Sequence, residues 1–116
     1  MAVDVADMKN GGAVDVGTSN VVVFTAPSDS TRRYLFKQLD VANKAGVTVN
    51  YDLWITDNST GESRYLADDI PIPAGAMDPI LEGSQLTLEP NDSLNAVCNT
   101  AAGIDINLSY SVLEIS

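Results

Sequence analysis

The chain has 116 residues, which is enough for one domain with a core of its own. Its hydrophobic content of 45% and charged content of 19% are those of a globular protein rather than a disordered one. The formal net charge of −10 argues against binding to nucleic acid, and the absence of histidine excludes Ser-His-Asp and Cys-His catalysis and histidine metal sites.

The chain contains a single cysteine, Cys98. One cysteine cannot form an internal disulfide or a cysteine-based zinc site. Without a histidine nearby to act as a base, we expect Cys98 to be a small, half-buried hydrophobic residue on a strand rather than a nucleophile.

The charges are unevenly placed along the chain. All six basic residues precede residue 65, whereas residues 65–116 contain eight acids and no base. If the fold keeps these two regions apart, one surface is strongly anionic. That acidity either only keeps the protein soluble, or it faces solvent while the basic cluster docks on an acidic partner.

Residues 1–19, "MAVDVADMKNGGAVDVGTS", mix short apolar pieces with a pair of glycines. They predict an N-terminal arm that is ordered only if something holds it. The segment has no apolar core of a signal peptide, and no stretch of the chain has the roughly 18 to 20 apolar residues of a membrane span. We therefore expect a protein made soluble in a cytosol, with no membrane partner.

From residue 20 the pattern becomes that of strands. The β-branched run 20–26 ends at the turn signal "PSDS", and "KAG" closes the next run, 31–43, as a hairpin turn. Plain alternation over 31–43 assigns its side chains to two faces, with Tyr34, Phe36 and Gln38 on one and Leu35, Lys37, Leu39 and Val41 on the other.

The clearest strand is "VTVNYDLWITD" at 47–57, in which apolar residues alternate with polar ones over a full ten residues. Gly61, in a turn that requires positive φ, connects it to a partner strand at 63–68. Trp54 falls on the polar side of this strand. It lies either under a second layer or in a contact with another chain.

Three prolines at 71–79 predict an edge, a bulge or a crossover. Short strands are expected at roughly 77–81, 85–88 and 93–98, and a final strand at 104–115. The final strand alternates regularly until Val112-Leu113, where the phase slips, which indicates a bulge or a change of strand partner. No stretch has helical periodicity together with a cap and a stop.

About eight short strands with turns every 8 to 12 residues predict an all-β fold. We expect a single antiparallel β-sandwich, jelly-roll-like, over residues 20–116, with residues 1–19 as an extended arm.

The acidic residues offer little chemistry. The neighbours Asp68 and Asp69 point to opposite faces of a strand, so they cannot easily share a ligand. Asp57, Asn58 and Glu62 bracket a turn that could hold calcium, but Asp and Asn are also the residues that turns prefer. The sequence therefore predicts no catalytic residue, no cofactor site and no metal site, and the chain is not expected to be an enzyme.

The C-terminal half resembles small virion structural proteins of tailed bacteriophages. The resemblance lies in an "I-P-A-G" segment, an "L-x-L-E-x-x-D-S-L" turn and strand, and an "A-A-G" before a final strand. The matching residues are Ile72-Pro73-Ala74-Gly75, then Leu86, Leu88, Glu89, Asp92, Ser93 and Leu94, and finally Ala101-Ala102-Gly103, Ser109-Tyr110 and Glu114-Ile115-Ser116.

Most of residues 20–116 are covered by the resemblance, including the hairpin around residues 48–72. Two features depart from the pattern. Asn91 stands where the family has a glycine, and extra residues separate Tyr110 from Glu114.

The resemblance implies a capsid decoration, or cement, protein. Such a protein would bind the major capsid protein on the outer surface of the head, after synthesis in the host cytoplasm, and would act as a homo-oligomer, a dimer or trimer. Arg32, Arg33, Lys37 and Trp54 are the expected docking residues, together with the arm. The alternatives are a tail or fibre component and, from another class, a carbohydrate-binding sandwich module.

Overall fold

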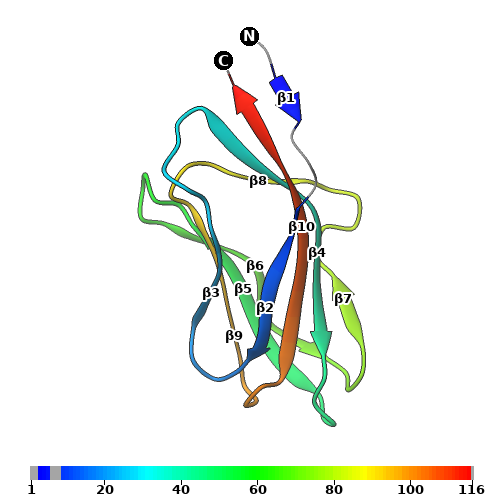
Figure 1. Cartoon of the computed structure of the whole chain (residues 1–116). Coiled ribbons are helices and arrows are strands. Elements are labelled where there is room, and N and C mark those ends of the chain that lie inside the picture. Colours follow the sequence, from blue (N-terminus) through cyan, green and yellow to red (C-terminus); the bar gives the residue numbers. More distant parts are fainter. Residues whose placement is uncertain (1–2, 6–8, 116) are drawn as a thin grey trace.

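A computed structural model describes the backbone of residues 3–5 and 9–115, and the side chains of residues 9–115. This part of the chain is all-β and contains no helix (Figure 1), which confirms the predicted fold class. The ten strands are β1 (Val3–Val5), β2 (Lys9–Val16), β3 (Val21–Thr25), β4 (Arg32–Asn43), β5 (Val49–Thr56), β6 (Ser63–Ile72), β7 (Met77–Pro79), β8 (Leu86–Leu88), β9 (Ser93–Cys98) and β10 (Ile104–Ile115).

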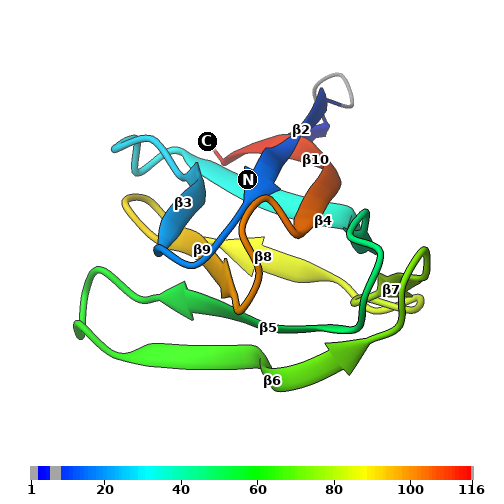
Figure 2. The same ribbon diagram turned by 90° about the horizontal axis from the view of Figure 1, so that it is seen from below.

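The strands form two antiparallel sheets that face each other (Figure 2). In the first sheet, β10 and β4 are central, β1 and β2 share the outer side of β10, and β7 and β8 share the outer side of β4. The second sheet has the order β3-β9-β5-β6. If each pair of short strands counts as one interrupted strand, the chain makes eight strands that wind between the two sheets as in a jelly roll.

The core lies between the sheets and follows the alternation of the sequence. In β5, buried side chains alternate with partly exposed ones along the whole strand. Phe24, Tyr34, Phe36 and Tyr110 pack together in the core, with ring centroids 5.0 to 6.1 Å apart. Cys98 is also buried, and its thiol donates to the carbonyl oxygens of Val16 and Thr100.

Strand β4 departs from plain alternation. Ser109 of β10 lies opposite Gln38, whereas Tyr110 lies opposite Phe36, so Lys37 is an extra residue in β4. Beyond this bulge the phase reverses. Leu39 and Val41 therefore point into the core, on the same side as Phe36, and their prediction on the opposite face is wrong.

Strand β10 changes partner along its outer side. Residues 104–110 pair with β2, and residues 113–115 pair with β1. The predicted phase slip at Val112-Leu113 falls at this change of partner, and Val112 itself remains buried with the inward residues of the strand. The irregularity in the pairing of β10 with β4 lies earlier, at the Lys37 bulge.

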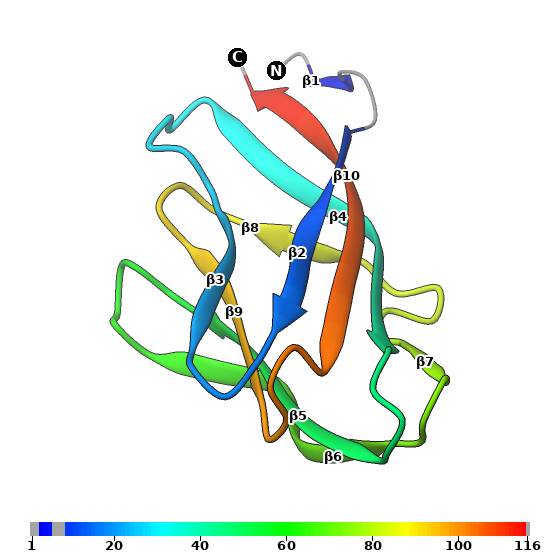
Figure 3. The same ribbon diagram turned by 60° about the horizontal axis from the view of Figure 1, so that its bottom comes forward.

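Much of the segment predicted as an arm, residues 1–19, lies along β10 (Figure 3). Strand β2 completes the sheet edge, and Val16 at its end is 1% exposed and belongs to the core. Within the described residues, the element that holds this segment is therefore β10 of the same chain. A division of the chain into an arm and a domain at residue 19 stays a prediction.

Other strand boundaries differ modestly from expectation. Strand β5 begins at Val49 rather than Val47, which is an exposed residue of the preceding turn. Strand β6 is longer than predicted, because two bulges in its pairing with β5 let it continue through Pro71.

Candidate docking surfaces

The four predicted docking residues do not form one site. Arg32, Arg33 and Lys37 lie on β4 in the first sheet, whereas Trp54 lies on β5 in the second sheet. The sandwich core separates the two layers. A partner that binds the outer face of one sheet therefore cannot contact all four residues of the same molecule.

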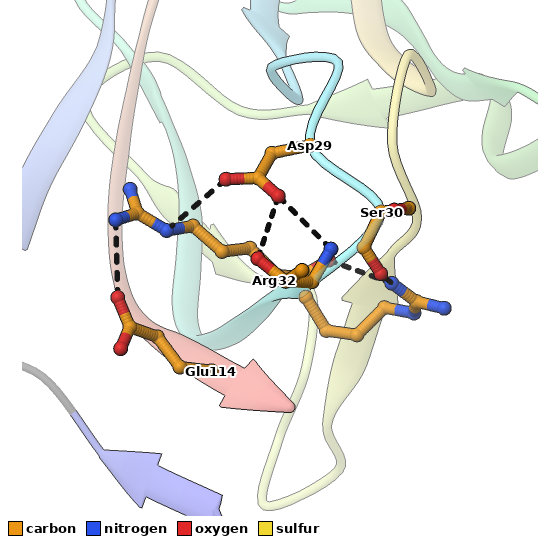
Figure 4. A network of polar contacts seen from close by, with 6 residues as sticks. Asp29, Ser30, Arg32 and Glu114 are labelled. Atoms are coloured by element: carbon orange, nitrogen blue, oxygen red, sulfur yellow. Dashed lines mark hydrogen bonds and ion pairs between the residues drawn. The ribbon is translucent and has the colours of Figure 1, made fainter. Parts of the chain in front are cut away.

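The side chain of Arg32 is engaged within the chain (Figure 4). Its Nη2 lies 3.0 Å from Oε1 of Glu114, on the facing end of β10, and its Nε lies 3.5 Å from Oδ2 of Asp29. Hydrogen bonds from the hydroxyl and backbone N–H of Thr31, together with the charge of Arg32, lower the pKa of Asp29. The sequence could not show this network, because Glu114 is distant in the chain and arrives only through strand pairing.

Arg33 has a different role from its neighbour. Its Nη1 donates to the backbone carbonyls of Ser30 and Arg32, at 3.1 and 2.8 Å. These bonds brace the loop before β4. Among the described residues Arg33 has no acidic partner, so its positive charge is not neutralised by a carboxylate of this chain.

Lys37 is the bulge residue of β4 and is exposed. Within the part of the chain that the structure describes, its ammonium group forms no ion pair. A bulge at this point directs a charged side chain away from the sheet, where it is available to a partner.

Trp54 is partly exposed on the outer face of the second sheet. It stacks on Tyr65, its cross-strand neighbour in β6, with ring centroids 5.6 Å apart and planes 29° apart. The indole is thus covered on one side by another side chain of the same sheet rather than by a second layer. Tyr65 is 54% exposed, and sequence reasoning missed it because its pairing with Trp54 depends on the register across two bulges.

Lys44 joins two acidic residues from different strands. Its Nζ contacts Asp15 at the end of β2 and lies 2.8 Å from Oδ1 of Asp105 at the start of β10. The backbone N–H of Asp15 also donates to Asp105 Oδ1, at 2.9 Å. Hydrogen bonds from Lys44 and Asp15 lower the pKa of Asp105, and the two carboxylates raise the pKa of Lys44.

The turn considered for calcium is organised by its own hydrogen bonds. Asp57 Oδ1 accepts from the backbone N–H and the hydroxyl of Ser59, which lowers the pKa of Asp57, and Arg64 lies 3.5 Å from Oδ2. The buried carboxylate of Asp92 ties this turn to β9 by accepting from the backbone N–H of Asn58 at 3.0 Å. These contacts give Asp57 and Asp92 a structural role in holding the turn.

The described residues contain no group of three or more acidic, cysteine or histidine side chains that could hold a metal ion. No pocket is found over this part of the chain. It also lacks a helix of the length and hydrophobicity that a membrane span requires. The features that remain as candidates for function are therefore surfaces of the sandwich.

No protein-family model matches the sequence. No protein of curated function matches it either. The fold, by contrast, is similar to that of several solved viral structures.

A chain from the acid-stable capsid of Helicobacter pylori bacteriophage KHP30 aligns with a TM-score of 0.58 at 10% identity, over 99% of this chain and 94% of that one. A chain of the T13 particle of infectious bursal disease virus aligns with a TM-score of 0.57 at 12% identity, and one of the Gx strain of that virus with 0.56 at 14%. These two alignments include 94% and 98% of this chain, which spans only about a third of the virus chains (31% and 32%). At 10–14% identity, these three alignments with chains of viral particles show a shared fold.

Proposed function

We propose that this protein is a structural, non-enzymatic component of a phage virion. The observation that carries the proposal is the alignment with the KHP30 capsid chain, which includes nearly the whole of both chains. The two chains are thus similar in length, so a chain of this size and of similar fold occurs in a phage capsid structure. The sequence resemblance to small virion proteins of tailed phages supports the same conclusion.

The finer role that we propose is decoration of the head exterior. The protein would bind the major capsid protein from outside and stabilise the lattice by adding buried area at junctions between subunits. The negative charge of the whole molecule suits an exterior position, because it disfavours contact with the packaged genome. Arg33 and Lys37 are the better basic docking candidates, since Arg32 is already paired with two carboxylates.

The experiment is co-sedimentation of the purified protein with heads of its phage that lack it. Saturable binding at a fixed ratio to the major capsid protein is the expected result. Absence of binding to heads, with the protein recovered on isolated tails, would overturn the decoration role and support a tail component.

Variants then identify the docking surface. Weaker binding by the double variant R33Q/K37Q places β4 in the contact, and weaker binding by W54A places the second sheet there. Deletion of residues 1–19 is unsuitable as a test of the arm, because it removes strand β2 and the core residue Val16. A shorter deletion, residues 1–8, leaves both in place.

A further inference from the structure

The two sheets have four outer sides, formed by β1 with β2, by β7 with β8, by β6 and by β3. An edge strand presents unpaired N–H and C=O groups, which are a template for a strand of another chain. Proteins that must not pair at an edge protect it with charged residues, proline, bulges or very short strands. The four sides of this sandwich can be compared by these features.

Three of the sides are protected. Strand β6 carries Arg64, Asp68, Asp69 and Pro71, and its pairing with β5 contains two register shifts. Strand β2 carries two charged residues and a register shift. Strands β7 and β8 have three residues each, and β7 ends in a proline.

The edge formed by β3 differs from the others in its lack of charge, although its pairing with β9 also contains a register shift, between Val22 and Phe24. Its sequence is VVVFT, without charge or proline, and residues 16–28 as a whole contain no charged residue. The adjacent strand β9 is uncharged too, so this property extends two strands into the sheet. Val22 is 61% exposed, and the described residues provide no strand on the outer side of β3 (Figures 2 and 3).

Strand β3 is also held firmly in place. Phe24 contacts Tyr34, Phe36 and Tyr110 of the first sheet with centroid distances of 5.0 to 5.7 Å. At the end of the strand, the backbone N–H of Ala26 donates to the carbonyl of Asp92, at 2.8 Å. A fixed strand loses little conformational entropy when it binds, so it is a favourable template.

We propose that β3 is a homodimer interface, at which it pairs antiparallel with β3 of a second copy across a twofold axis. Charge favours this mode of pairing between two copies. Each copy carries a net charge of −10, and two copies repel each other least where both present an uncharged edge. An edge without charge is complementary to itself, as a twofold interface requires. The product is a continuous eight-stranded sheet with the order β6-β5-β9-β3-β3-β9-β5-β6.

This dimer goes beyond the capsid proposal and does not depend on it. The outer faces of the two four-stranded sheets become one face in the dimer. Each copy contributes its Trp54–Tyr65 pair to that face. A partner that contacts both equivalent surfaces at once binds with an avidity that exceeds its affinity for a single surface.

The test is sedimentation equilibrium of the full chain, alone in buffer, for wild type, V22K and V47K. We expect wild type at about 100 μM to have twice the chain mass of 12.3 kDa. V22K should be a monomer, with Kd raised at least about tenfold, because it places like charges at the paired strands. Val47 is 58% exposed in a turn remote from β3, so V47K is a matched control that should dimerise as wild type.

A monomeric wild type, or a V22K variant that dimerises as strongly as wild type, overturns the proposal. If V22K does not fold, as judged by circular dichroism, T25K replaces it, because Thr25 is exposed at the end of the same strand. Amide hydrogen exchange provides a second measurement. Protection of β3 should rise with wild-type concentration and stay constant in the lysine variant, and equal behaviour of the two would also contradict the dimer.

Discussion

At the scale of single residues, the contact of Lys44 with Asp15 and Asp105 ties together three segments that are distant in the chain. Asp105 has a pKa below its ordinary 3.8, so its contribution to stability is present above that pH and is lost as the pH falls through the lowered value. Lys44 has a pKa above 10.5, so its contribution is present below that pH and is lost as the pH rises through the raised value.

We therefore predict a pH window for the variant K44M. Between about pH 5 and pH 9.5 its Tm should be about 1–4 °C below that of wild type, and the difference should shrink on either side. Thermal melts from pH 2.5 to 11 measure this. The control is K37M, which removes an exposed lysine without an ion-pair partner among the described residues and should have the Tm of wild type at every pH. A lowered Tm of K44M that persists unchanged at pH 2.5 would contradict a stabilising role for the ion pairs of Lys44.

Tyr51 connects the two sheets. Its hydroxyl donates to Oδ2 of Asp78, at 2.9 Å, and burial together with this bond raises the pKa of Tyr51 well above its ordinary value. We predict that Y51F lowers the free energy of unfolding by about 1–2 kcal/mol, because the partly buried hydrogen bond to the side chain of Asp78 is lost. Urea denaturation measures the loss, and Y65F, at an exposed tyrosine, should be near neutral; equal effects of the two variants would show that the bond contributes nothing.

The sequence predicted residue environments well where alternation was regular and poorly where a partner comes from a distant strand. The buried side chains of β5 follow from period-two alternation alone. The ion pair of Arg32 with Glu114 does not, because it exists only in the register of β4 against β10. Arg32 is therefore a docking candidate from the sequence alone, and its pairing with Glu114 becomes visible only in the fold.

At the scale of elements, strands that end in strong turn signals were predicted most accurately. The bounds 93–98 and 104–115 agree with β9 and β10. The sequence does not predict the β4 bulge. Lys37 and Gln38 are both polar, so the reversal of the inward–outward alternation there looks like an ordinary irregularity. The change of partner along β10 was one of two alternatives left open, and the pairing with β1 and β2 decides between them.

The bulge makes a prediction about deletions. Removal of Lys37 leaves Phe36 opposite Tyr110 and Gln38 opposite Ser109 in regular register, and it keeps every inward side chain inward. The deletion should therefore fold, at a cost of about 1–2 kcal/mol for altered twist. Deletion of Asp40 instead turns Val41 outward and should abolish the cooperative transition in urea. A Lys37 deletion that also fails to unfold cooperatively would show that the bulge is essential.

At the scale of the whole molecule, the uneven order of charges in the sequence does not produce two separate surfaces. Strand β10, from the half without bases, lies directly against β4, which carries three of the six basic residues. Arg32 pairs with Glu114 and Lys44 with Asp105, so acids of the second half neutralise bases of the first. Jelly-roll winding brings both halves into both sheets, and linear charge patterning cannot reveal this.

The molecule as a whole carries a net charge of −10, whereas its edge strand β3 is uncharged. The proposed dimer is then held by backbone hydrogen bonds and apolar contact and is opposed by long-range repulsion. Salt screens that repulsion, since the Debye length falls from about 14 Å at 50 mM to about 4 Å at 500 mM, and it leaves the strand pairing largely unaffected. We predict that Kd for dimerisation decreases about three- to tenfold over this range of NaCl, as measured by sedimentation equilibrium. For an interface built on ion pairs, Kd would instead increase with salt. A dimer that weakens as NaCl is added would therefore contradict pairing at β3.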